Sequence, residues 1–140
     1  MISIIKTKFM ILYINTTDKI SEIKLYDDKI EQIDALSFNG DFVLSEELTQ
    51  KIDALIAASG FKKDLSLIVV NIGPGSYTGL RIGVTTANAI AFALDIPIVE
   101  LSSEDDMKKI IRNAMFKKKF ASPALPIYKN PPHITKKKVD

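Results

Sequence analysis

The chain has 140 residues, of which 46% are apolar and 26% charged, and its net charge at pH 7 is +2. This length suits one domain with a real core, and so small a net charge does not by itself indicate a nucleic-acid or membrane partner. The absence of cysteine excludes disulfides and thiolate chemistry. No apolar run reaches the roughly 18 residues of a membrane span, and the N-terminus lacks a signal-peptide pattern. We therefore expect a cytoplasmic protein.

Three short runs near the N-terminus predict an antiparallel meander. Residues 10–15 form a compact apolar run, residues 20–26 alternate imperfectly, and residues 30–38 can make a third strand. Turn residues separate the runs. An amphipathic helix follows, with Asp41 as its N-cap and Gly60 just past its end. Its apolar stripe consists of Leu44, Leu48, Ile52, Leu55 and Ile56.

The stretch 67–94 organises the rest of the chain. Its first six residues are almost all apolar and predict a buried strand, the sequence Gly-Pro-Gly-Ser then predicts a turn, and a helical pattern follows. Small residues recur at every fourth position of this helix, so they share one face and leave a nearly flat groove. That groove either packs closely on the sheet or receives a partner. The residues are Gly79, Gly83, Ala87 and Ala91.

Pro97 ends that helix, and residues 98–101 form a fifth strand. Ser102 or Ser103 then caps a last helix, whose first turn would contain the acidic residues 104–106. From residue 122, prolines and lysine clusters predict an extended tail.

The element order β-β-β-α-β-α-β-α predicts an α/β protein with a mixed sheet and a ribonuclease-H-like fold. This is the topology of a single lobe of the actin-like ATPase superfamily. We divide the chain into an N-terminal extension (1–9), the lobe (10–118) and a C-terminal tail rich in proline and lysine (119–140).

Phosphate binding is one interpretation of the Gly-rich loop, because a strand, a glycine-rich loop and a helix can aim backbone N–H groups at an anion. The loop is not a P-loop, since no Gly-Lys-Ser/Thr follows, and it misses the dinucleotide spacing by one residue. A tight connection between strand and helix is the other interpretation. The candidate phosphate-binding residues are Gly73, Pro74, Gly75, Ser76 and Thr78.

No group of residues predicts catalysis, a metal site or a cofactor. The carboxylates that would hold magnesium in this fold are replaced by Asn15 and Asn71 at the ends of the first and central strands. His133 is the only histidine, and Ser76 has no evident base. The lysine runs 117–119 and 136–138 could contact RNA phosphates, although such runs more often serve solubility.

The stretch 72–103, IGPGSYTGLRIGVTTANAIAFALDIPIVELSS, closely resembles the signature of the TsaB (YeaZ) family, which contains a GPGSFTGLRIG-type motif. MILYINTT, at 10–17, resembles the opening strand of that family, and IYKNPP, at 127–132, resembles its closing segment. The resemblance covers roughly residues 10–104 in register.

The resemblance implies a non-catalytic subunit for the synthesis of threonylcarbamoyladenosine at A37 of tRNAs that read codons beginning with A. Family members act as scaffold for the catalytic paralogue TsaD, with the ATPase TsaE joining the complex, and we expect contact with tRNA to be indirect. Contact with TsaD, and a competing homodimer, use helices that match residues 42–59 and 79–94. The partner-binding residues expected on this basis are Leu44, Leu48, Ile52, Gly79, Leu80, Arg81, Gly83, Ala87 and Ala91.

The chain departs from the family pattern in two respects. Asn15 replaces the usual aspartate of the opening strand, and because few residues follow Ser103 we expect the family's second lobe to be missing. Family members begin near Met10, so we expect residues 1–9 to be an extension or a wrongly assigned start. Two alternatives stay open: a small nucleotide-binding hydrolase that uses the GPGS loop, and a degenerate homologue that no longer pairs.

Overall fold

The computed structural model describes residues 9–39, 44–59 and 65–128. Its elements follow the predicted order. The strands are β1 (Met10–Asn15), β2 (Ile20–Tyr26), β3 (Gln32–Asn39), β4 (Leu65–Gly73) and β5 (Ile98–Ser102), and the helices are α1 (Leu44–Ser59), α2 (Tyr77–Leu94) and α3 (Met107–Lys117).

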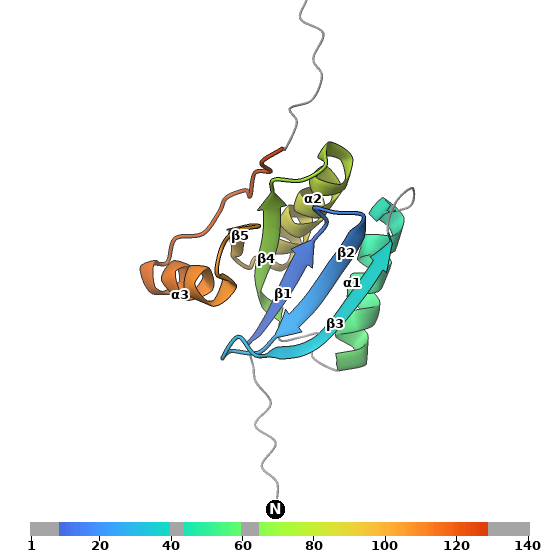
Figure 1. Ribbon diagram of the computed structural model, residues 1–140. Helices are drawn as coiled ribbons and strands as arrows, with labels where there is room; N and C mark the ends of the chain where they lie inside the picture. The colour runs from blue at the N-terminus through green and yellow to red at the C-terminus, as the bar shows by residue number, and fades with distance from the viewer. Residues whose placement is uncertain (1–8, 40–43, 60–64, 129–140) are drawn as a thin grey trace, which may run out of the picture.

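The five strands form one mixed sheet in the order β3-β2-β1-β4-β5 (Figure 1). The pairs β1–β2 and β2–β3 are antiparallel, which confirms the predicted meander. β4 runs parallel to both β1 and β5, and such parallel connections need crossover segments, which α1 and α2 supply. The topology is that of the predicted ribonuclease-H-like lobe.

Helices cover both faces of the sheet. α1 and α2 pack on one face against Leu12, Ile14 and Val70, whereas α3 packs on the other face, near Ile11 and Val69. β1 and β4 are therefore buried on both sides, which explains why their sequences are continuous apolar runs rather than alternating ones.

The apolar stripe of α1 faces the sheet, as the sequence predicts. Leu48, Ile52, Leu55 and Ile56 are all buried in the core between α1, α2 and the sheet. The predicted N-cap Asp41 and the predicted terminal Gly60 lie outside the described residues. No helix in the described ranges is long and apolar enough to cross a membrane.

The third strand begins later than predicted, at Gln32 rather than Ile30. Ile30 has a left-handed backbone (φ 62°) and a buried side chain, so it belongs to the preceding turn. The carboxylate of Asp27 closes that turn, because its Oδ1 accepts hydrogen bonds from the backbone N–H groups of Lys29 and Glu31, both at 2.9 Å.

The predicted cap of the last helix is wrong. The N-cap of α3 is Asp106, whose carboxylate accepts a hydrogen bond from the backbone N–H of Lys109. Ser102 instead ends β5, where its N–H and hydroxyl donate to Asp105 Oδ2, each at 2.8 Å. Asp105 thereby forms a turn between strand and helix, and the acidic residues precede the first turn of α3 rather than forming it.

After α3, residues 119–128 run without a helix along the edge of β5 towards the start of α2 (Figure 1). Ala121 forms a bridge with Ile98, and Tyr128 forms one with Gly75. Ala124 is buried, and its backbone N–H and C=O each form a 2.9 Å hydrogen bond with the side-chain amide of Asn88 on α2. This part of the predicted tail therefore packs on the lobe.

Candidate functional site

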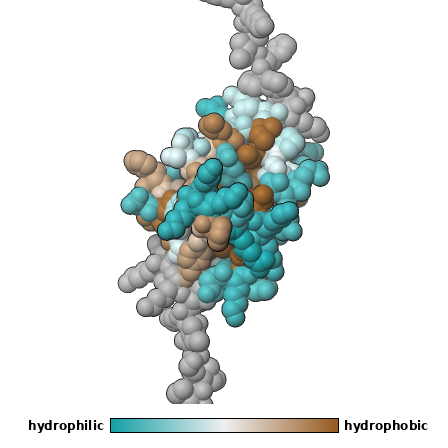
Figure 2. Space-filling model, turned by 90° about the vertical axis from the view of Figure 1, so that its left-hand side faces the viewer, coloured by the Kyte–Doolittle hydropathy of each residue, from teal (hydrophilic) through white to brown (hydrophobic). Residues whose placement is uncertain are grey.

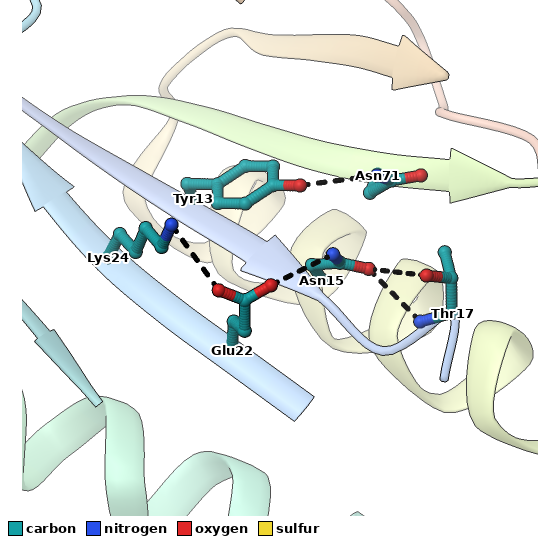
Figure 3. Close-up of polar contacts among 6 residues, drawn as sticks. All are labelled: Tyr13, Asn15, Thr17, Glu22, Lys24 and Asn71. Carbon is teal, nitrogen blue, oxygen red and sulfur yellow. Dashed lines mark hydrogen bonds and ion pairs between the residues drawn. The ribbon is translucent and has the colours of Figure 1, made fainter. Parts of the chain in front are cut away.

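The carboxyl ends of β1 and β4 lie side by side where the sheet changes from antiparallel to parallel pairing, the usual place for a ligand in such sheets. Figure 3 shows the polar side chains there. Asn15, at the end of β1, receives two hydrogen bonds on Oδ1, from the N–H of Thr17 at 3.1 Å and from its hydroxyl at 2.8 Å. The amide nitrogen of Asn15 points to Glu22 Oε1 at 3.4 Å, and Lys24 pairs with the same carboxylate at 3.3 Å.

Asn71, at the corresponding place on β4, also serves the protein's own chain. It is 5% exposed, and its Oδ1 accepts the N–H of Gly73 at 3.0 Å. Its Nδ2 donates to the hydroxyl of Tyr13 at 3.2 Å (Figure 3). Burial raises the pKa of Tyr13, and the hydrogen bond from Asn71 partly opposes that shift.

The donor set at this edge does not suit a divalent cation. Magnesium prefers carboxylate oxygens, and the two positions nearest the strand ends carry amides whose oxygens already accept hydrogen bonds from the chain. Among the described residues, no group of three or more His, Cys, Asp or Glu side chains could hold a metal ion. What this arrangement can do is fix two turns, after β1 and after β4.

The Gly-rich loop is packed between two segments of the same chain. A side chain at Gly75 would lie 2.9 Å from the backbone of Thr17, and one at Gly73 would collide with the carbonyl of Ile127. The N–H of Ser76 donates to the carbonyl of Thr17 at 3.4 Å. The loop glycines therefore permit close approach of the β1–β2 turn and residues 127–128, which supports the interpretation as a tight connection. The candidate phosphate residues Pro74, Ser76 and Thr78 are exposed.

The groove formed by the small residues of α2 is filled by the protein itself. Gly83, Ala87 and Ala91 are buried against the sheet, and a Cβ atom on Gly83 would collide with the side chain of Thr16. The hydroxyl of Thr16 donates to the carbonyl of Gly79 at 2.7 Å. The expectation that a partner helix enters this groove is therefore wrong, because Thr16, directly after β1, occupies it.

Other residues expected to bind a partner are buried as well. Leu48, Ile52 and Leu80 are at most 4% exposed and belong to the core of the lobe. Arg81 is exposed on α2. The structure does not describe the side chain of Leu44.

The exposed sides of α1 and α2 carry small apolar residues that the sequence analysis did not single out. Phe92 is 89% exposed. α1 precedes β4 and α2 precedes β5, and these two strands are parallel. Both helices therefore end at the end of the sheet where β4 and β5 begin. Positions 81, 85, 89 and 93 are also spaced four residues apart and so share the exposed side of α2. The sequence alone could have identified these positions as one side of the helix, although spacing does not tell which side faces the sheet. We call these residues the outer face: Ala54, Ala57, Ala58, Ala89, Phe92 and Ala93.

Comparison with known proteins agrees with this fold. Residues 44–128 match the family model described as "TsaD: tRNA N6-adenosine threonylcarbamoyltransferase". The chain is 66% identical over 41 residues to the tRNA threonylcarbamoyladenosine biosynthesis protein TsaB of Bacillus subtilis, covering 29% of this chain and 18% of that protein. It is 32% identical over 79 residues to the TsaB of Haemophilus influenzae, covering 49% and 34%.

A solved structure of YeaZ from Pseudomonas aeruginosa superposes with a TM-score of 0.61 at 20% identity, covering 79% of this chain and 50% of that one. The superposition shows a shared fold, and this chain matches only half of the YeaZ structure. The matched residues 44–128 include α1, the Gly-rich loop and all of α2. The chain therefore belongs to the family of the TsaD model and, within it, is a member of the TsaB (YeaZ) family.

Proposed function

We propose that this protein is a cytoplasmic, non-catalytic subunit in the synthesis of tRNA threonylcarbamoyladenosine, and that it binds a TsaD-like catalytic partner. The proposal rests on the hydrogen bonds that the side chain of Asn15 accepts. Its side-chain oxygen is occupied by Thr17, at the point where an actin-like ATPase would present a carboxylate to magnesium. A subunit without that ligand acts by binding rather than by hydrolysis. The TsaB names of its relatives supply the pathway.

We place the partner contact on the outer face of α1 and α2. Exposed apolar residues on a lobe are a common mark of a protein interface, and alanines allow the backbones of two helices to approach closely. Phe92 would be the anchor, because aromatic side chains that are exposed in the free subunit often dominate binding energy. A homodimer through the same face would compete with the partner, and an ATPase such as TsaE would join through the complex.

The test is co-purification of the full chain with the TsaD homologue of the same genome, followed by the tRNA modification assay. Ala89→Arg should weaken binding by about 2 kcal/mol or more, roughly 30-fold in Kd, because it puts a charged side chain into the contact. Ala35→Arg is the matched control, since Ala35 is also exposed but lies on β3. Circular dichroism must show both variants folded. Equal binding of the two variants would contradict the placement.

A nucleotide-binding hydrolase receives no support from the site. The Gly-rich loop holds the chain's own backbone closely, and both strand-end amides bond within the chain. If this protein did hydrolyse ATP, the nucleotide with magnesium would raise its melting temperature. We expect no such shift.

A further inference from the structure

The strongest concentration of charge among the described residues lies on and just after α3. The segment 107–119, MKKIIRNAMFKKK, contains six cationic residues and no aspartate or glutamate. It also contains one large aromatic residue that faces solvent, since Phe116 is 88% exposed. We call this the α3 basic surface: Lys108, Lys109, Arg112, Phe116, Lys117, Lys118 and Lys119.

The cations of this surface face solvent because the apolar side of α3 is already used. Ile111 is 2% exposed, and Met107, Ile110 and Ala114 pack with it on the sheet. Figure 2 looks at the side of the molecule where α3 lies in Figure 1 and shows hydrophilic residues with a smaller hydrophobic area between them. The surface is thus a basic face with an apolar spot, held on a packed helix.

Helix electrostatics do not account for this arrangement. Cations are favourable near the C-terminus of a helix, which covers Lys117, but unfavourable near the N-terminus, where Lys108 and Lys109 lie. Lys118 ends the helix with a left-handed backbone (φ 53°), a position at which glycine is the usual residue. The backbone of Lys118 is therefore part of the ordered end of α3 rather than of a free tail.

Most of these cations have no acidic partner. Of the six cations on this surface, only Lys108 forms an ion pair with a residue that the structure describes, Glu31 at 3.7 Å, and both side chains are well exposed. Such a pair is weak. The remaining cations are available to anions from outside, over a helix about 16 Å long.

We propose that the α3 basic surface binds RNA directly, with lysines and Arg112 on backbone phosphates and Phe116 stacked on an unpaired base. Aromatic side chains among cations are the usual arrangement for single-stranded RNA, whereas a membrane would need the apolar side of the helix, which is buried in the lobe. This inference rests on the proposed function for its choice of tRNA as the RNA. It differs from the sequence-based expectation that contact with tRNA is indirect.

The experiment measures binding of an unmodified tRNA transcript to the full chain at several salt concentrations. The slope of the logarithm of the tRNA association constant against the logarithm of the salt concentration is negative. The double variant Lys109→Gln/Arg112→Gln, which removes two cations, should reduce the magnitude of this slope by about 1 to 2. Lys19→Gln/Lys51→Gln removes two charges elsewhere and should leave the slope unchanged. Phe116→Ala should weaken binding by about 5- to 100-fold with little change in slope.

Phe92→Ala is the control for Phe116→Ala, because the two residues are equally exposed but lie on α2 and α3. The inference predicts a crossed result: Phe116→Ala loses tRNA and keeps the TsaD-like partner, and Phe92→Ala does the reverse. RNA binding through α3 in a chain that binds no partner would refute the proposed function and leave this inference standing.

Three results would overturn the inference. The first is absence of tRNA binding by the full chain, and the second is binding that the α3 variants do not change. The third is binding to phosphatidylserine vesicles that is tighter than binding to tRNA and that the same variants abolish, since that would assign the surface to an anionic membrane.

Discussion

Replacing Gly83 with alanine should destabilise the lobe, although it removes a glycine from the middle of a helix. Helix propensity alone predicts a gain of about 1 kcal/mol. The new Cβ atom would collide with the hydroxyl oxygen of Thr16 and lie 3.0 Å from two of its carbon atoms. Thr16 is 1% exposed, and it cannot rotate away without losing the 2.7 Å hydrogen bond to the carbonyl of Gly79. Overpacking typically costs about 1–3 kcal/mol, and a lost buried hydrogen bond about 1 kcal/mol more. The net loss should be about 1–3 kcal/mol.

Urea unfolding followed by circular dichroism measures this loss, and a double-mutant cycle assigns it to the contact. Thr16→Ala removes the hydroxyl and methyl groups, so Gly83→Ala should cost at least about 1 kcal/mol less in that background. Ala89→Gly, on the exposed side of α2, is the control that reports propensity alone, with a loss of about 1 kcal/mol. A Gly83→Ala variant more stable than the wild type, or a cycle without coupling, would refute the close packing of β1 against α2.

Three further predictions concern the polar contacts. Asn15→Asp should lower stability at pH 7 by about 1 kcal/mol, because the new carboxylate would face the carboxylate of Glu22. The loss should disappear below about pH 4, where carboxylates become protonated. Thermal unfolding measures this loss, and a loss that does not depend on pH would contradict the prediction. Asn88→Ala should speed hydrogen exchange in residues 121–128, because two hydrogen bonds to that segment are lost, and unchanged exchange would show that the segment docks by other means. Burial raises the pKa of Tyr13 in the folded protein, so the neutral phenol contributes stability that is fully present below the unfolded pKa of 10.0. This contribution is lost as the pH rises through the folded pKa. The alkaline decline in the free energy of unfolding should therefore be flatter for Tyr13→Phe.

The elements of the lobe could be predicted because each carries a local signal. The runs at 10–15 and 67–72 are continuous and apolar because both faces of β1 and β4 are covered. The stripe of α1 has helical spacing because one side of that helix lies on the sheet. The order of these elements then specified the mixed sheet.

The contacts between distant segments could not be predicted in the same way. The face of Gly79 and Gly83 was evident, but spacing does not say whether a sheet or a partner lies against it, and Thr16 fills it from 63 residues away. The cap of α3 was misplaced because Asp105 and Asp106 compete with the serines for the same hydrogen-bonding role. The docking of Ala124 on Asn88 has no signal in a segment rich in proline.

The proposal that the chain acts as a binding subunit is tested most directly by mixing it with the TsaD homologue of its genome and assaying tRNA modification. We predict a stable complex that restores activity, with Ala89→Arg losing both properties and Ala35→Arg keeping both. A folded wild-type chain that neither binds the homologue nor raises its activity would contradict the account.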